Sequence, residues 1–234
     1  MKKILLLIVV VVLSTMANAQ DFLGFQLGYA QPTTRLNTAQ QKNNLNTTEY
    51  NGLKLGLLYD ATIINGFGVS MGLNYTFGAN TSDWSSVGKL PYPKTRSKSF
   101  YHQLEIPVDW QYKFEIAQNT WVILYTGPTL QCGLDFSKRN FKDNGKEVVL
   151  ENDQNLFSVD DMKDNALKRV NVTWGVGAGF QYERYFIRGG YDFGIINPYK
   201  AYQFDQVVGE GNPRTRGRFD QWQIKLGVYF WQSK

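Results

Sequence analysis

The chain has 234 residues and a formal net charge of +5, which is the size of one large β domain or two small ones. Its single cysteine, Cys132, excludes an internal disulfide and any metal site built from several cysteines. Its single histidine, His102, excludes His-rich metal centres and catalytic designs with two imidazoles. The charge is modest for a nucleic-acid-binding protein, so no nucleic-acid partner is expected.

The first residues have the layout of a secretory signal peptide. Met1-Lys2-Lys3 is basic, an apolar run follows over 4–13, and Ala17-Asn18-Ala19 supplies small residues for cleavage. The apolar run is about half the roughly 20 residues that a bilayer-spanning helix needs. We therefore predict a cleaved signal peptide over 1–19 and a single exported domain over 20–234.

Beyond residue 19, apolar and polar residues alternate, which is typical of strands with one apolar face. The clearest runs are Gln103 to Glu115 and Asn171 to Glu183. The segment Thr120 to Leu134 is apolar on both faces, so its register stays open. The pattern predicts eight strands, over 23–29, 53–59, 67–77, 103–115, 120–134, 171–183, 185–195 and 221–230.

The two faces of these segments distinguish a membrane barrel from a soluble one. One face is large and aromatic, with Trp110, Trp174 and Phe180 among its members, and the other combines charges with many glycines. A transmembrane barrel turns its apolar face toward lipid and keeps its polar face inside. The sequence therefore predicts an all-β, eight-stranded, antiparallel, up-and-down transmembrane barrel, with a soluble secreted β-barrel as the alternative.

An eight-stranded barrel is narrow enough for side chains to fill its lumen, and inward glycines would make room for them. Because charges are costly to bury alone, those on the inner face should pair with one another. Arg188 is expected to reach a carboxylate such as Glu183 across the short turn at 184–185. The expected lumen network consists of Lys54, Glu105, Asp109, Lys113, Glu183, Arg188, Asp192 and Lys225.

The connections between the predicted strands alternate between long and short. This asymmetry is typical of outer-membrane barrels, which have short periplasmic turns and longer external loops. In the long connection 135–169, Asn144-Gly145 is a hairpin-turn signal, so strands are expected to continue beyond the membrane there. The connections are 31–49, 61–66, 79–97, 116–119, 135–169, 184–185 and 197–218.

Several motifs resemble the outer-membrane β-barrel domain family, which includes PorT-like proteins of Gram-negative bacteria and barrels of the OmpX and OmpA type. The resemblance spans nearly all of the mature chain and implies an outer-membrane protein, in a group whose members are mostly of unassigned function. A link to secretion or envelope assembly stays open, since these residues do not indicate it, and no cofactor is expected. The motifs are Leu104-Glu105-Ile106-Pro107-Val108, Gly127-Pro128, Gly175-Val176-Gly177-Ala178-Gly179, Arg188-Gly189-Gly190-Tyr191, Ile196-Asn197 and Leu226-Gly227-Val228-Tyr229-Phe230.

The leading functional prediction is a non-enzymatic membrane protein that serves as a structural or interaction module. The expected partners are outer-membrane lipid and lipopolysaccharide, the barrel-assembly machinery during insertion, and a protein or glycan ligand at the external loops. Arg214, Arg216 and Arg218 form a basic cluster that could contact lipopolysaccharide phosphates.

Two other functional classes stay open. One is a lipid-modifying enzyme at the external rim, for which His102, near a strand end, is the candidate residue. Its place in the alternation nevertheless puts His102 on the outward face. The other is a narrow channel.

Pro107 and Pro128 lie within internal strands, where each removes a backbone N–H donor from the strand pairing. We therefore expect a local irregularity there, usually a bulge, rather than a functional role.

Overall fold

The structure is a computed structural model that describes residues 20–37, 46–82, 85–86, 94–143, 147–149, 154–155, 168–198 and 216–233. The predicted signal peptide, residues 1–19, lies outside the described residues. Among the described residues, no helix is long and apolar enough to cross a membrane.

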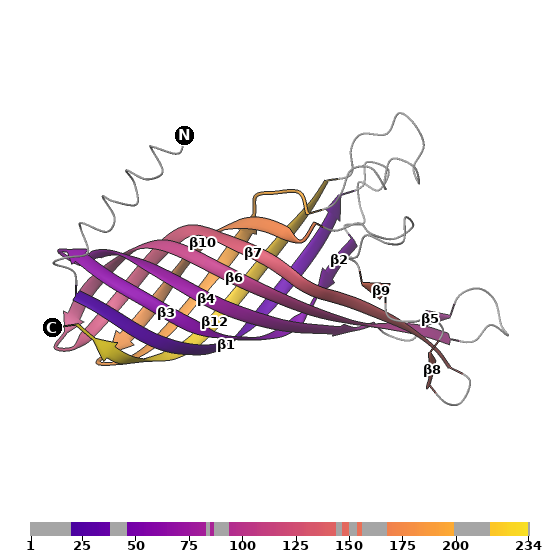
Figure 1. The fold of residues 1–234 in the computed structure, drawn as a ribbon, viewed down its shortest axis with the longest axis horizontal. Coiled ribbons are helices and arrows are strands. Elements are labelled where there is room, and N and C mark those ends of the chain that lie inside the picture. The colour runs from indigo at the N-terminus through magenta and orange to yellow at the C-terminus, as the bar shows by residue number, and fades with distance from the viewer. Residues whose placement is uncertain are drawn as a thin grey trace.

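Eight long antiparallel strands form a closed ring (Figure 1). Around the ring, the order is β1, β3, β4, β6, β7, β10, β11 and β12, and β12 pairs with β1 to close it. This confirms the predicted eight-stranded up-and-down barrel. The strands are β1 (Gln20–Asn37), β3 (Asn51–Ile64), β4 (Phe67–Thr81), β6 (Lys94–Ala117), β7 (Thr120–Asp143), β10 (Val170–Tyr182), β11 (Tyr185–Gly194) and β12 (Arg216–Gln232).

Three tight turns define one end of the barrel, called the turn end below. The β3–β4 turn is Asn65-Gly66, with φ of 46° and 84°, the pair of positive angles that a two-residue type I′ hairpin requires. Asn119 and Glu183 take positive φ in the β6–β7 and β10–β11 turns. Ser233 donates its backbone N–H to the Asp21 carbonyl (2.9 Å), so the last strand ends beside the start of β1.

At the opposite end, called the loop end, the strands run further than predicted. β6 and β7 have 24 residues each and project beyond the other strands (Figure 1). Parts of the predicted connections 31–49, 79–97, 135–169 and 197–218 are therefore strand. The alternation marks only the apolar belt, whereas backbone pairing continues where both faces are polar.

Four short strands pair with these extensions. Three residues of β8 pair with the end of β7, from Phe141↔Val149 to Asp143↔Glu147, as expected from the Asn-Gly signal, although residues 144–146 lie outside the described part. The short strands are β2 (Asn46–Glu49), β5 (Ser85–Ser86), β8 (Glu147–Val149) and β9 (Gln154–Asn155).

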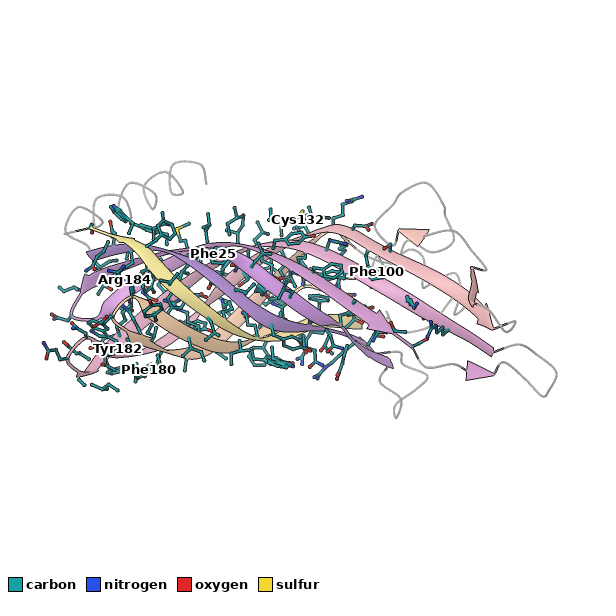
Figure 2. The ribbon with its side chains drawn as sticks, turned by 90° about the horizontal axis from the view of Figure 1, so that it is seen from below. Phe25, Phe100, Cys132, Phe180, Tyr182 and Arg184 are labelled. Atoms are coloured by element: carbon teal, nitrogen blue, oxygen red, sulfur yellow. The ribbon has the colours of Figure 1, made fainter. Side chains whose placement is uncertain are left out.

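The side chains follow the inverted pattern that the sequence predicts. Trp110, Trp174 and Phe180 are each about two-fifths exposed on the outer wall, where Phe25 and Phe180 also project in Figure 2. Lys113 and Arg188 are buried inside. The structure also settles the open register of 120–134, because Ile123, Tyr125, Thr129 and Gln131 point inward and are buried, whereas Leu124 and Leu130 are exposed.

Inward glycines leave space for large lumen side chains. A Cβ on Gly177 would lie 2.3 Å from Tyr125 Cζ, and one on Gly227 would lie 2.1 Å from Phe186 Cζ. These distances are far below van der Waals contact, so the glycines are needed for the tyrosine and phenylalanine to enter the lumen. By contrast, a Cβ on the outward Gly189 would meet nothing closer than 3.8 Å.

The structure shows the local irregularity predicted at the two prolines, as missing ladder pairs, but no bulge. The ladder of β6 with β4 lacks pairs between Met71↔Val108 and Asn74↔Glu105, but the register is the same on both sides of Pro107. Pro128 pairs with Trp174 in an unshifted ladder. The barrel therefore tolerates each missing donor locally, without inserting a residue.

Replacing Gly227 by alanine is expected to lower the free energy of unfolding by about 1–3 kcal/mol, the usual cost of overpacking. Gly189→Ala is the matched control and should change it by less than about 0.5 kcal/mol, because its Cβ has room. Urea unfolding in detergent micelles, followed by tryptophan fluorescence, measures both. Equal stability of the two variants would contradict the packing role of Gly227.

Candidate functional site

The centre of the lumen near the turn end is an ionic cluster around Asp60. Its Oδ2 atom lies 2.8 Å from Arg188 Nη2 and 3.1 Å from Lys113 Nζ, and it accepts a hydrogen bond from the Tyr229 hydroxyl at 2.6 Å. Gln111 donates its side-chain amide to Oδ1 of the same carboxylate. One carboxylate therefore holds two cations from strands on different sides of the ring.

A second cluster lies nearer the loop end, around Glu105. Lys54 Nζ lies 2.6 Å from Glu105 Oε2 and donates to the side chain of Gln223 at 2.7 Å. Thr76 donates its hydroxyl to Glu105 Oε1 at 2.6 Å. Gln223 in turn donates to Asp192 at 2.9 Å, which links the second cluster to β11.

Two further charges, Asp109 and Lys225, are buried in the same region, with 7% and 4% exposure. Among the described residues, neither forms an ion pair within 4.0 Å. They lie among charges of both signs, and the described part of the inner face carries four buried cations and four buried carboxylates when Asp60 is included. The lumen charge is therefore balanced as a set, although not strictly by pairs.

The predicted lumen residues can now be placed individually. Lys54, Glu105, Asp109, Lys113, Arg188, Asp192 and Lys225 all point inward and are buried. Glu183 does not: it is exposed in the β10–β11 turn, where its carbonyl accepts a hydrogen bond from Gln181. The predicted Arg188–Glu183 pair is therefore wrong, because the Arg188 side chain reaches across the lumen to Asp60.

Asp60 is the central residue that the sequence analysis missed. It comes directly after the predicted strand 53–59, and it keeps the parity of that strand's inner face. Extending the alternation by one residue past Tyr59 would have placed this carboxylate inside the barrel. The strand was assigned from the four outward apolar residues that precede Asp60. The inward carboxylate just beyond the assigned end of the strand was therefore overlooked.

Aromatic side chains close the lumen at the loop end. Tyr50, Tyr101, Phe136 and Phe219 form a buried cluster there, and the Tyr101 and Phe219 rings lie 5.6 Å apart. The adjoining cavity measures about 30 Å³, room for about one water molecule. At the turn end, a larger hollow of about 490 Å³ is lined by Phe22, Lys113, Gln181 and other residues. Because Lys113 lines this hollow and also contacts Asp60, the hollow reaches the Asp60 cluster.

At the loop-end rim, His102 lies on the outer wall, as its parity predicts. Its Nδ1 atom lies 2.5 Å from the Tyr75 hydroxyl, and its ring lies 4.9 Å from that of Phe77. Asp135 is its cross-strand partner on β7. Among the described residues, no serine hydroxyl is hydrogen-bonded to this imidazole, and no group of His, Cys, Asp or Glu could hold a metal ion.

The predicted basic cluster lies at the loop-end part of β12. Arg214 falls outside the described residues, and Arg216 begins β12 opposite Asn37. Arg218 faces outward and contacts Asp220 through Nε and Nη2, at 2.8 and 2.7 Å. Only Arg218 of the three can therefore be assigned a side-chain contact.

These features define a closed β-barrel with an apolar outer wall and a filled polar lumen. The sequence matches the outer membrane protein beta-barrel domain over residues 4–230, so the chain belongs to this family. The barrel is accordingly placed in the outer membrane. In barrels of this kind the short turns face the periplasm and the longer loops face the exterior, so we expect the turn end on the periplasmic side and the loop end on the external side. No curated protein matches the sequence.

Solved structures with a similar fold include Ail of Yersinia pestis, at 12% identity and a TM-score of 0.42, covering 90% of this chain and 99% of that one. Neisserial surface protein A has 14% identity and a TM-score of 0.35, covering 88% and 97%. The outer membrane protease OmpT of Escherichia coli has 7% identity and a TM-score of 0.42, covering 92% and 98%.

Breaking the Asp60 cluster should destabilise the barrel strongly. Arg188→Met leaves a buried carboxylate short of one partner, so the free energy of unfolding should fall by about 3–5 kcal/mol. In the double variant Arg188→Met with Asp60→Asn, the loss should be smaller than the sum of the single losses by about 0.5–3 kcal/mol. Urea titrations in micelles measure all the variants.

Glu183→Gln is the control for the same measurement. Its carboxylate is exposed and lies outside the cluster, so stability should change by less than about 0.5 kcal/mol. A loss as large as that of Arg188→Met would restore Glu183 as the partner and contradict the observed arrangement.

Proposed function

We propose that this protein is a non-enzymatic, non-conducting barrel that serves as a structural or interaction module of the outer membrane. The observation that carries the proposal is the filled lumen. Lys54, Glu105 and Arg188 are almost wholly buried inside it, and aromatic rings close its external end. In this proposal, a cleaved signal peptide over 1–19 directs export, and the barrel-assembly machinery inserts the chain.

The external extension of β6 and β7 is the feature best suited to recognition. The two strands remain paired from Thr95↔Lys142 down into the barrel, so they present a hydrogen-bonded two-stranded ribbon. A ribbon continuous with a closed barrel holds its surface in a fixed orientation, which lowers the ordering cost of binding. A protein or glycan partner at this surface fits a role in secretion or envelope assembly.

A sealed lumen predicts that the purified protein does not conduct ions. In planar lipid bilayers under a steady applied voltage, insertion should leave the current at its baseline, because burying an unscreened ion among paired charges and rings is costly. A general porin in the same bilayer is the control for detection. Discrete conductance steps from this protein would overturn the proposal in favour of a narrow channel.

A rim enzyme acting on membrane lipids is the second candidate, and the outward His102 opposite Asp135 is the observation that favours it. On the main proposal, expressing the wild-type protein and the His102→Ala variant should yield identical lipid A and phospholipid profiles by mass spectrometry. A deacylated or otherwise altered lipid that appears with the wild type and disappears with His102→Ala would establish the enzyme instead.

A further inference from the structure

The outer wall near β1 and β12 shows where the apolar belt ends. On β12, the outward side chains from Trp222 to Trp231 are apolar, and the two tryptophans are 40% and 50% exposed. These residues are nine positions apart, which is about 30 Å along a strand and about 23 Å across the membrane at a tilt of about 40°. That height matches the apolar band of about 25 Å in such barrels.

Trp222 has the contacts of a residue at the external membrane interface. Its ring lies 5.1 Å from that of Tyr29 on β1, and its indole N–H donates to the side chain of Gln31. The rings therefore face the apolar belt while their polar edges point toward the loop end. Side chains two and four positions before Trp222 on β12, toward the loop end, lie at the level of the lipid headgroups.

An arginine pair and a carboxylate occupy this level. Arg35 and Arg218 are direct register partners on β1 and β12, and both face outward. Asp220 lies between them: its Oδ2 atom is 2.7 Å from Arg218 Nη2 and 3.6 Å from Arg35 Nε, and its Oδ1 atom accepts the Gly194 N–H at 3.0 Å. The carboxylate is fully buried, whereas the Arg35 and Arg218 side chains are 42% and 46% exposed.

This arrangement sets one contacting carboxylate against two guanidinium groups. Like charges directly opposite each other on paired strands are destabilising. Among the described residues, Asp220 is the one carboxylate within 4.0 Å of either guanidinium group, whereas Glu49 on the neighbouring strand β2 accepts a hydrogen bond from Gln31 at 3.0 Å. Arg35 Nε is buried without a hydrogen-bond partner, so an anion would contact the exposed outer parts of the two guanidinium groups, which lie side by side.

We propose that Arg35 and Arg218, held together by Asp220, bind a phosphate group on a lipid headgroup of the outer leaflet. Guanidinium groups match phosphate oxygens in charge and in fork geometry. The site lies on the lipid-facing wall directly above Trp222 and Tyr29, where a headgroup attached to acyl chains is at high local concentration. The phosphate contacts the exposed parts of the two guanidinium groups, and the acyl chains of the lipid lie along the apolar wall.

The test uses the full-length protein in detergent micelles and a fluorescent, bis-phosphorylated lipid A as the probe, with binding followed by anisotropy. Arg35→Gln and Arg218→Gln should each weaken binding by about tenfold, the loss expected when a charged hydrogen bond is removed. Dephosphorylated lipid A should bind the wild type as weakly as the variants bind the phosphorylated form. Inorganic phosphate should not compete at concentrations comparable with the lipid.

Arg184→Gln is the matched control, because it removes one exposed arginine at the periplasmic turn end and should leave affinity unchanged. Heat-dependent gel migration verifies that each variant is folded. If a glutamine variant fails to insert, Arg35→Lys and Arg218→Lys take its place, with a smaller expected loss because charge is kept and the fork is lost. Equal loss in Arg184→Gln, tight binding of dephosphorylated lipid, or competition by inorganic phosphate would each overturn the lipid-phosphate site.

Discussion

Backbone hydrogen bonding in hydrocarbon is the constraint from which the rest of this structure follows. A strand that crosses a bilayer has no water to satisfy its N–H and C=O groups, so every strand must have two paired neighbours. The pairing of β12 with β1 removes the last free edge. Once the ring is closed, alternate side chains are divided between lipid and lumen, and Trp110 on one face implies Asp109 and Gln111 on the other.

The narrow ring then determines the chemistry of the lumen. Eight strands leave room for side chains and little else, so charged groups must solvate one another. Asp60 does this for Arg188 and Lys113 at once, and Glu105 does it for Lys54. Because little water enters the lumen, its polar side chains pair with one another and form a packed network. Glycines on the same face are part of this filling, since Tyr125 could not enter the lumen if Gly177 carried a side chain.

The fold is predictable from the sequence where the residue-by-residue alternation alone determines it, and the side-chain partners are not, because they depend on neighbours across the barrel. Parity alone places Lys54, Asp109 and Lys225 inside. It cannot identify partners, because strands far apart in sequence face each other across the lumen, as Arg188 and Asp60 do. The β6–β7 extension was also underestimated, since its outward positions, such as Lys98, are polar and break the apolar alternation while the backbone ladder continues.

The outward-facing Asp220 illustrates how position alters the meaning of a charge. In the lumen, the same carboxylate would be one more buried charge, balanced by the cations around it. On the outer wall, two residues from Trp222 toward the loop end, it is buried, accepts the Gly194 N–H and contacts both Arg35 and Arg218, whose side chains are partly exposed. A barrel whose lumen is filled by its own side chains can contact other molecules only through its two ends and its outer wall. The exposed arginine pair on that wall therefore bears more directly on recognition than the larger number of charges inside.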